Sequence, residues 1–237
     1  MSVLTLYELA AADQSVRFSP HCWKTRMALA HKGLDVHRRA WRFMDKDVIA
    51  FSGQQAVPVL VDENNEFVFD SWEIALYLER KFPDRPSLFD GAGTIPLTRF
   101  INRFADIAVL TAIVPLILYD IYLALDPHDQ PYFRASREKR FGKRLEEVAG
   151  DLPSRFNDLR NALTLLRQTL RDQPFIAGDQ PAYADYCVFG MFMWARCISA
   201  VELLEQNDPV YAWRERLLDA FGGLARQAPT INKMQGS

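Results

Sequence analysis

The chain has 237 residues and a formal net charge of −2; 49% of its residues are hydrophobic and 24% are charged. This composition is typical of a globular protein with one large domain or two small ones, and it excludes an extensively disordered chain. Acidic and basic residues are intermixed, as in Glu138-Lys139-Arg140, so we expect no nucleic acid partner.

The cysteines and the longest apolar run indicate the cellular compartment and whether the chain associates with a membrane. Cys22, Cys187 and Cys197 form no CxxC pair and no metal-ligand spacing, so we predict no metal site and a reducing, cytoplasmic environment. The first nine residues lack the basic region and cleavage site of a signal peptide. The longest apolar run, about 107–118, contains Pro115 and is too short to span a bilayer, so we expect no membrane association.

The first third of the chain predicts strands and helices in the order β-α-β and then β-β-α. Alternating apolar residues favour strands, whereas 3.6-residue spacing and capping residues favour helices. The predicted elements are a strand over 5–9, a helix over 20–32, a strand over 36–43, a hairpin with strands over 57–61 and 67–69, and a helix over 71–82. This order is typical of a thioredoxin-like domain.

The rest of the chain is helical in pattern, with prolines between the segments. We predict helices over about 95–125, 132–149, 153–172, 182–200 and 209–222. The sequence therefore predicts a thioredoxin-like α/β domain over 1–85, a linker over 86–94, and an all-α helical-bundle domain over 95–237.

Ser19 is the first candidate functional residue. It precedes Pro20 at the expected start of a helix, where unpaired backbone N–H groups and the helix dipole stabilise an anion. A thiol with an unperturbed pKa of about 8.5 is mostly protonated at neutral pH, and each pKa unit corresponds to about 1.4 kcal/mol. A hydroxyl hydrogen bond together with the dipole can supply that energy. The alternative is that Ser19 only caps the helix.

Ser19-Pro20-His21-Cys22 also has the form of the redox C-P-x-C pattern with a hydroxyl in place of the first sulfur. Cys22 then lacks the local partner for a disulfide, so dithiol oxidoreductase activity is disfavoured. Two alternatives remain for Cys22: a monothiol reductase, or a small buried apolar residue on the first helix.

Two further pairs are candidates for binding an extended peptide. Val57-Pro58 precedes the hairpin: a cis bond would leave the backbone of Val57 free to pair with a peptide, whereas a trans bond would simply start an edge strand. Asp70-Ser71 combines a carboxylate, a hydroxyl and a helix N-terminus, which suits the ammonium and carboxylate of an α-amino acid head. The alternative for this pair is again a helix cap.

Aromatic residues of the helical half are the candidates for an apolar site. Tyr119, Tyr122 and Trp194 could line a pocket, although aromatic residues at helical spacing more often belong to a core. The four histidines show no metal-ligand spacing, and His21 is expected to be a solvated residue of the first helical turn.

Taken together, these residues resemble the glutathione transferase superfamily over essentially the whole chain. The resemblance rests on Ser19-Pro20, Val57-Pro58 and Asp70-Ser71 in order, followed by Asp185 in the helical half. Relatives have a capping Ser or Thr where Ala182 stands here, so we expect Asp185 to cap its helix through fewer bonds. The strings over 19–29 and 136–147 resemble the branch of bacterial lignin β-etherases and related fungal etherase-type transferases.

The resemblance implies roles for these positions. Ser19 would hydrogen-bond the sulfur of glutathione, Val57 before a cis Pro58 would pair with its cysteinyl unit, and Asp70 and Ser71 would hold its γ-glutamyl head. Gln55 matches a position that some classes use for the glycine carboxylate, with Arg42 and Lys46 as alternatives. Relatives commonly form homodimers.

Three functions follow as hypotheses. The first is a glutathione transferase with glutathione as co-substrate, which attacks a hydrophobic, aromatic electrophile and includes β-aryl ether cleavage among its compatible reactions. The second is a non-catalytic carrier of aromatic ligands, and the third is a reductase based on Cys22.

Overall fold

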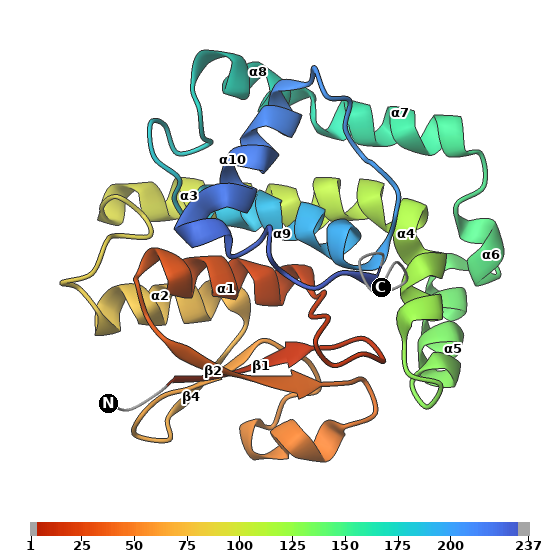
Figure 1. Cartoon of the computed structure of the whole chain (residues 1–237), viewed down its shortest axis with the longest axis horizontal. Coiled ribbons are helices and arrows are strands. Elements are labelled where there is room, and N and C mark those ends of the chain that lie inside the picture. Colours follow the sequence, from red (N-terminus) through yellow and green to blue (C-terminus); the bar gives the residue numbers. More distant parts are fainter. Residues whose placement is uncertain (1–3, 232–237) are drawn as a thin grey trace.

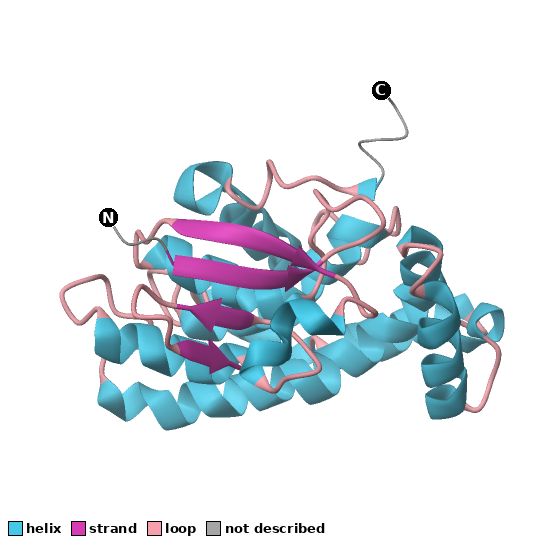
Figure 2. Ribbon diagram, turned by 90° about the horizontal axis from the view of Figure 1, so that it is seen from below, coloured by secondary structure: helices cyan, strands magenta, loops and turns pink. Residues whose placement is uncertain are grey.

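The computed structural model describes residues 4–231, and its N-terminal part is built on a mixed four-stranded sheet (Figures 1 and 2). β1 runs parallel to β2 and antiparallel to β3, which pairs with β4, so the strand order is β2-β1-β3-β4. The strands and first two helices are β1 (Leu4–Leu9), α1 (Pro20–His31), β2 (Val36–Trp41), β3 (Val59–Val61), β4 (Phe67–Phe69) and α2 (Ser71–Lys81). This confirms the predicted thioredoxin-like order.

The helices of this part lie on both faces of the sheet. α1 and α2 lie between the sheet and the helical half, and a short 3₁₀ helix, η1 (Lys46–Ser52), lies on the opposite face (Figure 1). Phe51 of η1 contacts Tyr7 of β1, with 5.5 Å between their ring centroids. The sequence did not predict η1, and β2 ends two residues before the predicted limit of 43.

The second half contains helices and no strand among the described residues, which confirms the helical domain of the predicted fold. Two predicted helices are broken: Gly142, at φ +66°, ends the helix predicted over 132–149, and the helix predicted over 153–172 breaks at Leu163. The elements are η2 (Ala92–Thr94), α3 (Ile95–Phe104), the π-helical turn η3 (Ala105–Val109), α4 (Leu110–Ala124), α5 (Gln130–Phe141), α6 (Leu145–Val148), α7 (Leu152–Ala162), α8 (Thr164–Asp172), α9 (Tyr183–Ile198) and α10 (Pro209–Gly223).

η2, α3, η3 and α4 join into one continuous helix of 33 residues, Ala92–Ala124, which is the long helix of the molecule. By length and composition this helix could cross a membrane, so the expectation that no segment is long enough was wrong. The run extends beyond the apolar residues 107–118 because neither Asp106 nor Pro115 ends it. Half of its most apolar window is buried inside the protein, which is also the behaviour of a core helix.

α9 forms the centre of the molecule, and its N-terminus is held by Asp185. The fully buried Asp185 carboxylate accepts hydrogen bonds from the backbone N–H of Ile176 (2.7 Å), Ala177 (3.2 Å) and Ala182 (3.1 Å) and from Trp213 Nε1 (2.8 Å). Ala182 makes no side-chain cap bond, and the neighbouring loop and α10 supply Asp185 with donors that the local sequence does not reveal.

Buried charge also holds α1 against the sheet. Glu8 of β1 is fully buried, although its neighbours in the strand are apolar. Its carboxylate lies 3.6 Å from Nε of Arg26 on α1 and 3.9 Å from Arg38 on β2. Burial raises the pKa of Glu8, and Arg26 and Arg38 oppose that rise. The cluster therefore brings together charges from α1 and from both parallel strands, and neither Glu8 carboxylate oxygen has a hydrogen-bond partner among the described residues.

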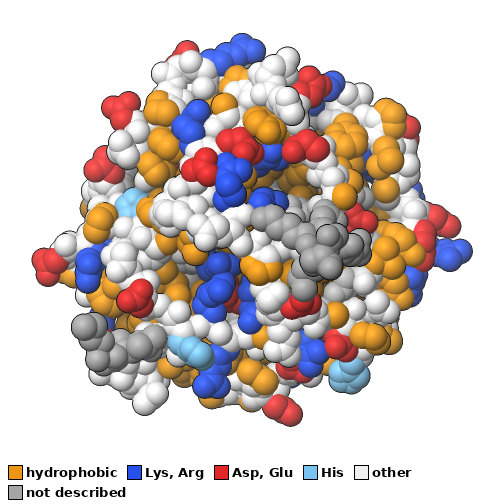
Figure 3. All heavy atoms as spheres, in the orientation of Figure 1, with side chains coloured by type: hydrophobic (Ala, Val, Ile, Leu, Met, Phe, Trp, Pro, Cys, Tyr) orange, Lys and Arg blue, Asp and Glu red, His pale blue; other side chains and the backbone are white. Residues whose placement is uncertain are grey.

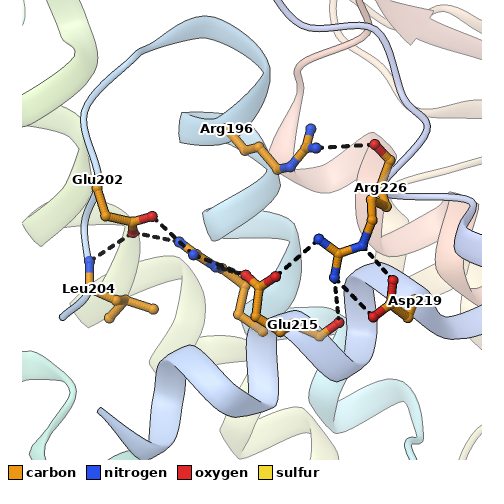
Figure 4. A network of polar contacts seen from close by, with 7 residues as sticks. Arg196, Glu202, Leu204, Glu215, Asp219 and Arg226 are labelled. Atoms are coloured by element: carbon orange, nitrogen blue, oxygen red, sulfur yellow. Dashed lines mark hydrogen bonds and ion pairs between the residues drawn. The ribbon is translucent and has the colours of Figure 1, made fainter. Parts of the chain in front are cut away.

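Arg226, which follows α10, is linked to α9 by a hydrogen bond and to α10 by ion pairs (Figure 4). Arg196 donates to the backbone oxygen of Arg226 at 3.1 Å, and the guanidinium of Arg226 pairs with Glu215 and Asp219. On the face seen in Figure 3, acidic and basic side chains are likewise interspersed among apolar ones. Such exposed pairs each contribute about 0–1 kcal/mol to stability.

Candidate active site

Ser19 is the N-cap residue of α1. Its Oγ accepts a hydrogen bond from the backbone N–H of Cys22 at 3.3 Å, and Pro20 takes the first helical position. The first turn of α1 contains no acidic residue, so the positive end of the helix dipole is not neutralised from within the turn. The cap uses an oxygen lone pair and leaves the hydroxyl proton available for donation, so capping and thiol activation are compatible at this position.

Cys22 is fully buried one turn into α1. Burial first and the Glu8 carboxylate second raise the pKa of its thiol to about 12, against a hydrogen bond with Ser19. A thiol with that pKa is protonated at neutral pH and is a poor nucleophile. This environment suits a small packing residue and disfavours a Cys22-based reductase.

Val57 and Pro58 lie just before β3, and their peptide bond is cis. Val57 and Pro58 are buried, whereas Gln55 and Ala56 before them are exposed. Within residues 4–231, the backbone N–H and C=O of Val57 make no hydrogen bond to another backbone group. The backbone at Val57 is therefore free to pair with an extended peptide laid beside the end of β3.

Asp70 is the N-cap residue of α2 and has an unusual backbone, with φ +67°. Its Oδ1 accepts hydrogen bonds from Trp72 N (2.8 Å) and Glu73 N (3.3 Å), which leaves Oδ2 available to a cation. Ser71 is buried at the first position of α2, and its carbonyl accepts a hydrogen bond from Tyr183 of α9. Positive φ at a residue other than glycine often marks functional sites.

The candidates for the glycine carboxylate differ in their surroundings. Gln55 is exposed two residues before Val57. Arg42 is bonded to Asp45 (3.0 Å) and Asp126 (2.6 Å), so its charge is already paired with carboxylates. The Lys46 ammonium lies 5.5 Å from the ring centroid of Tyr132. Gln55 is thus the candidate whose polar atoms are least committed to the protein.

The aromatic candidates of the helical half are only partly brought together. Tyr119 and Tyr122 of α4 stack with 5.9 Å between ring centroids. Trp194 is half-buried on α9, and no ring contact joins it to either tyrosine in the described part of the chain. The sequence did not predict a cavity of about 370 Å³ at the end of α4. It is lined by Asp120, Leu123, Ala124, Ile198, Ala200, Val201 and Ile231.

The sequence also did not predict a charge cluster of His21, Lys24 and Asp106 at the start of α1. Nζ of the fully buried Lys24 on α1 lies 2.6 Å from Asp106 and 2.8 Å from Asn102, both from the helical half. His21, expected to be solvated, is partly buried, with Nδ1 3.8 Å from Asp106. Burial first and Lys24 second lower the pKa of His21 to about 4, although Asp106 and Asp70 oppose the shift.

The lowered pKa of His21 predicts how stability depends on pH. The folded protein binds a proton at His21 less readily than the unfolded chain, whose histidine pKa is about 6.5. This part of the stability is present above pH 6.5 and is lost as the pH falls towards about 4. We expect His21→Asn to lose less unfolding free energy over that range than the wild type, measured by urea titrations. Equal losses would contradict the assignment.

Comparisons with known proteins agree with this geometry. The protein-family model described as "Glutathione S-transferase, N-terminal domain" matches residues 18–81. The family model described as "Glutathione S-transferase, C-terminal domain" matches residues 97–221. The glutathione S-transferase-like protein ustS of Aspergillus flavus is 27% identical over an alignment of 139 residues, which covers 54% of this chain and 50% of that protein. The match thus spans only half the length of this curated relative.

Solved structures share the architecture over nearly the whole chain. Glutathione transferase GSTFuA2 from Phanerochaete chrysosporium is 28% identical, with a TM-score of 0.76, and the match covers 96% of this chain and 95% of that one. The glutathione S-transferase CsGST63524 of Ceriporiopsis subvermispora, solved in complex with glutathione, gives a TM-score of 0.83 at 24% identity, covering 92% and 96% of the two chains. The C-terminal domain match alone covers more than half of the sequence, so the chain belongs to the glutathione S-transferase family.

Proposed function

We propose that this glutathione transferase binds glutathione across β3, α1 and α2 and ionises its thiol at Ser19. The observation that carries the proposal is the Ser19 hydroxyl at the N-terminus of α1, where the cap from Cys22 N uses an oxygen lone pair and the first turn contains no acidic residue. A hydrogen bond to a charged group contributes about 1.5–3 kcal/mol and a helix dipole about 0.3–1 kcal/mol. Together they lower the pKa of the bound thiol by about 1 to 3 units.

The remaining candidates fit the other parts of the tripeptide. The free backbone of Val57 would pair with the cysteinyl unit, Oδ2 of Asp70 would accept from the γ-glutamyl ammonium, and the N-terminus of α2 at Ser71 would hold its carboxylate. Gln55 would reach the glycine carboxylate. Calorimetry of glutathione binding to the Asp70→Asn and Ser71→Ala variants tests these roles.

We propose a hydrophobic, aromatic electrophile as the second substrate. The thiolate sulfur attacks an electrophilic carbon, and the thiol proton leaves to solvent. In β-aryl ether cleavage, the C–S bond forms as the C–O bond breaks, and the phenolate departs. The stacked Tyr119 and Tyr122 and the apolar cavity at the end of α4 are the candidate contacts. The 28% identity to the fungal glutathione transferase GSTFuA2 supports the transferase part of this proposal.

The competing carrier hypothesis is favoured by the same apolar cavity. Conjugation and aryl-ether cleavage assays over a panel of aromatic electrophiles separate the two. Product formation that depends on Ser19 supports the transferase, whereas saturable dye binding without any product supports the carrier. Retention of deglutathionylating activity by Cys22→Ser would exclude the reductase, as the burial of Cys22 leads us to expect.

We also propose a homodimer that buries an exposed apolar stripe on the long helix. Leu97 and Phe100 are each 70% exposed and Ile107 is 67% exposed, at spacings that place them on one side of the helix. Single apolar residues on a surface are ordinary, but a stripe of this kind marks an interface. Phe51, Phe67 and Phe69 are further exposed aromatic residues, contributed by η1 and β4.

The dimer leads to a mutational prediction. Phe100→Asp places a charge in the stripe, so we expect the molar mass in solution to fall from that of a dimer to that of a monomer. Leu165→Asp is the matched control, because Leu165 on α8 is also 70% exposed but lies outside the stripe. Light scattering coupled to size exclusion measures both. A wild-type monomer, or a Phe100→Asp dimer, would contradict the proposal.

A further inference from the structure

α9, in the C-terminal half, contacts the first residues of α1 and α2, the two helices whose N-termini lie at the proposed glutathione site. α9 lies beside α1 (Figure 1), and Tyr183 at the start of α9 reaches the start of α2. Its residues Tyr183 and Gly190 are seven positions apart, which is two helical turns, so they share one face and are separated by about 10 Å along the axis. Tyr183 contacts Ser71, the first residue of α2, and Gly190 faces Pro20, the first residue of α1.

The contact at Gly190 leaves no room for a side chain. A Cβ atom there would lie 2.4 Å from the backbone oxygen of Pro20 and 3.2 Å from Cγ of Lys24. A backbone oxygen in a helix cannot move away by a rotamer change, so any Cβ would push α1 and with it Ser19. Nζ of the same Lys24 is bonded to Asn102 and Asp106. The start of α1 thus contacts both α9 and the long helix.

The contact at Tyr183 is a buried hydrogen bond. Its hydroxyl donates to the backbone oxygen of Ser71 at 2.6 Å, and the side chain is fully buried. The ring lies 6.0 Å from that of Trp72 and 5.6 Å from that of Phe89, measured between centroids. The backbone N–H of Tyr183 donates to Leu88 at 2.9 Å. The start of α2 is therefore fixed to the same helix that fixes α1.

We propose that Tyr183 and Gly190 are positioning residues, and that α9 sets the separation between the two helix N-termini of the glutathione site. The N-terminus of α1 acts on the thiol, and the N-terminus of α2 holds the γ-glutamyl head. This inference rests on the proposed function. It assigns a separate task to each residue: Gly190 governs thiol ionisation through Ser19, and Tyr183 governs binding through Ser71.

The two tasks predict opposite effects of two substitutions. Gly190→Ala should raise the pKa of the bound glutathione thiol by about half a unit or more. It should lower kcat at neutral pH with recovery at higher pH, and leave the Kd for glutathione near the wild-type value. Tyr183→Phe should raise the Kd about 2- to 10-fold and leave the thiol pKa unchanged. Thiolate absorbance against pH and calorimetry provide the two readouts.

The control is Val188→Ala, which removes buried volume from α9 about 200° around the helix from Gly190. It should lower stability without moving either readout. If Gly190→Ala folds and keeps the wild-type thiol pKa, or if Tyr183→Phe keeps the wild-type Kd, the inference is overturned. If Gly190→Ala does not fold, Tyr183→Phe decides alone. A wild type that binds no glutathione overturns the proposed function itself, and that result is distinct from these.

Discussion

Replacing Ser19 by alanine is expected to lower kcat/KM about 10- to 100-fold at neutral pH. The estimate follows from the loss of a hydrogen bond to the charged thiolate, which is about 1.5–3 kcal/mol. The substitution also removes the cap that accepts from Cys22, which costs about 1 kcal/mol of stability. Steady-state conjugation kinetics measure the first effect, and urea unfolding measures the second.

The pH profile separates the chemical role of Ser19 from the capping role. A thiol that is no longer stabilised ionises nearer its ordinary pKa, so the Ser19→Ala variant should regain activity as the pH rises. Ser19→Thr keeps a hydroxyl and should retain most of the wild-type activity. Ser15→Ala, at an exposed serine of the preceding loop, is the matched control and should be unchanged. Equal activities of Ser19→Ala and wild type at every pH would remove Ser19 from its role.

Asp185→Ala is expected to lower the free energy of unfolding by about 3–5 kcal/mol. The substitution leaves the backbone N–H groups of Ile176, Ala177 and Ala182 and the indole N–H of Trp213 without their acceptor. Their combined desolvation is large because the site is fully buried. Equilibrium denaturation followed by intrinsic fluorescence measures the loss.

Asp179→Ala provides the comparison for this prediction. Asp179 lies in the loop that precedes α9, six residues before Asp185, and its side chain is exposed. We expect its replacement to change the unfolding free energy by no more than about 0.5 kcal/mol. A loss at Asp185 no larger than the loss at Asp179 would show that the four hydrogen bonds do not hold the helix.

The parts of the fold that could be predicted are those encoded locally. Ser19 with Pro20 and Asp70 before α2 are helix caps whose signals lie within four residues. The hairpin of β3 and β4 is likewise closed by a short polar turn, so its register needs no distant contact. These elements follow the sequence prediction closely, and they include the candidate positions for the sulfur and the γ-glutamyl head.

The parts that could not be predicted depend on contacts between distant residues. The Lys24–Asp106 pair joins residues 82 positions apart, and the Tyr183–Ser71 bond joins residues 112 positions apart. No spacing rule relates such residues. Burial of Lys24 is unfavourable until the long helix supplies its acceptors, so the sequence alone does not show why α1 contains a lysine. Contacts of this kind join the two halves of the molecule.

The candidate apolar site shows the same limit. Tyr119 and Tyr122 are three residues apart on one helix, so helical spacing alone brings their rings together. Whether Trp194 shares a site with them depends on how α9 packs against α4, and that information is spread over both helices. Arg42 is a similar case, because its partner Asp126 lies 84 residues away.

The pKa of the glutathione thiol on the wild-type protein is the most direct test of this account. Titration of thiolate absorbance at saturating protein should give a value about 1 to 3 units below that of the free tripeptide. A bound thiol that titrates like the free one would show that the alcohol at the start of α1 does not activate it, and the proposed chemistry would fall.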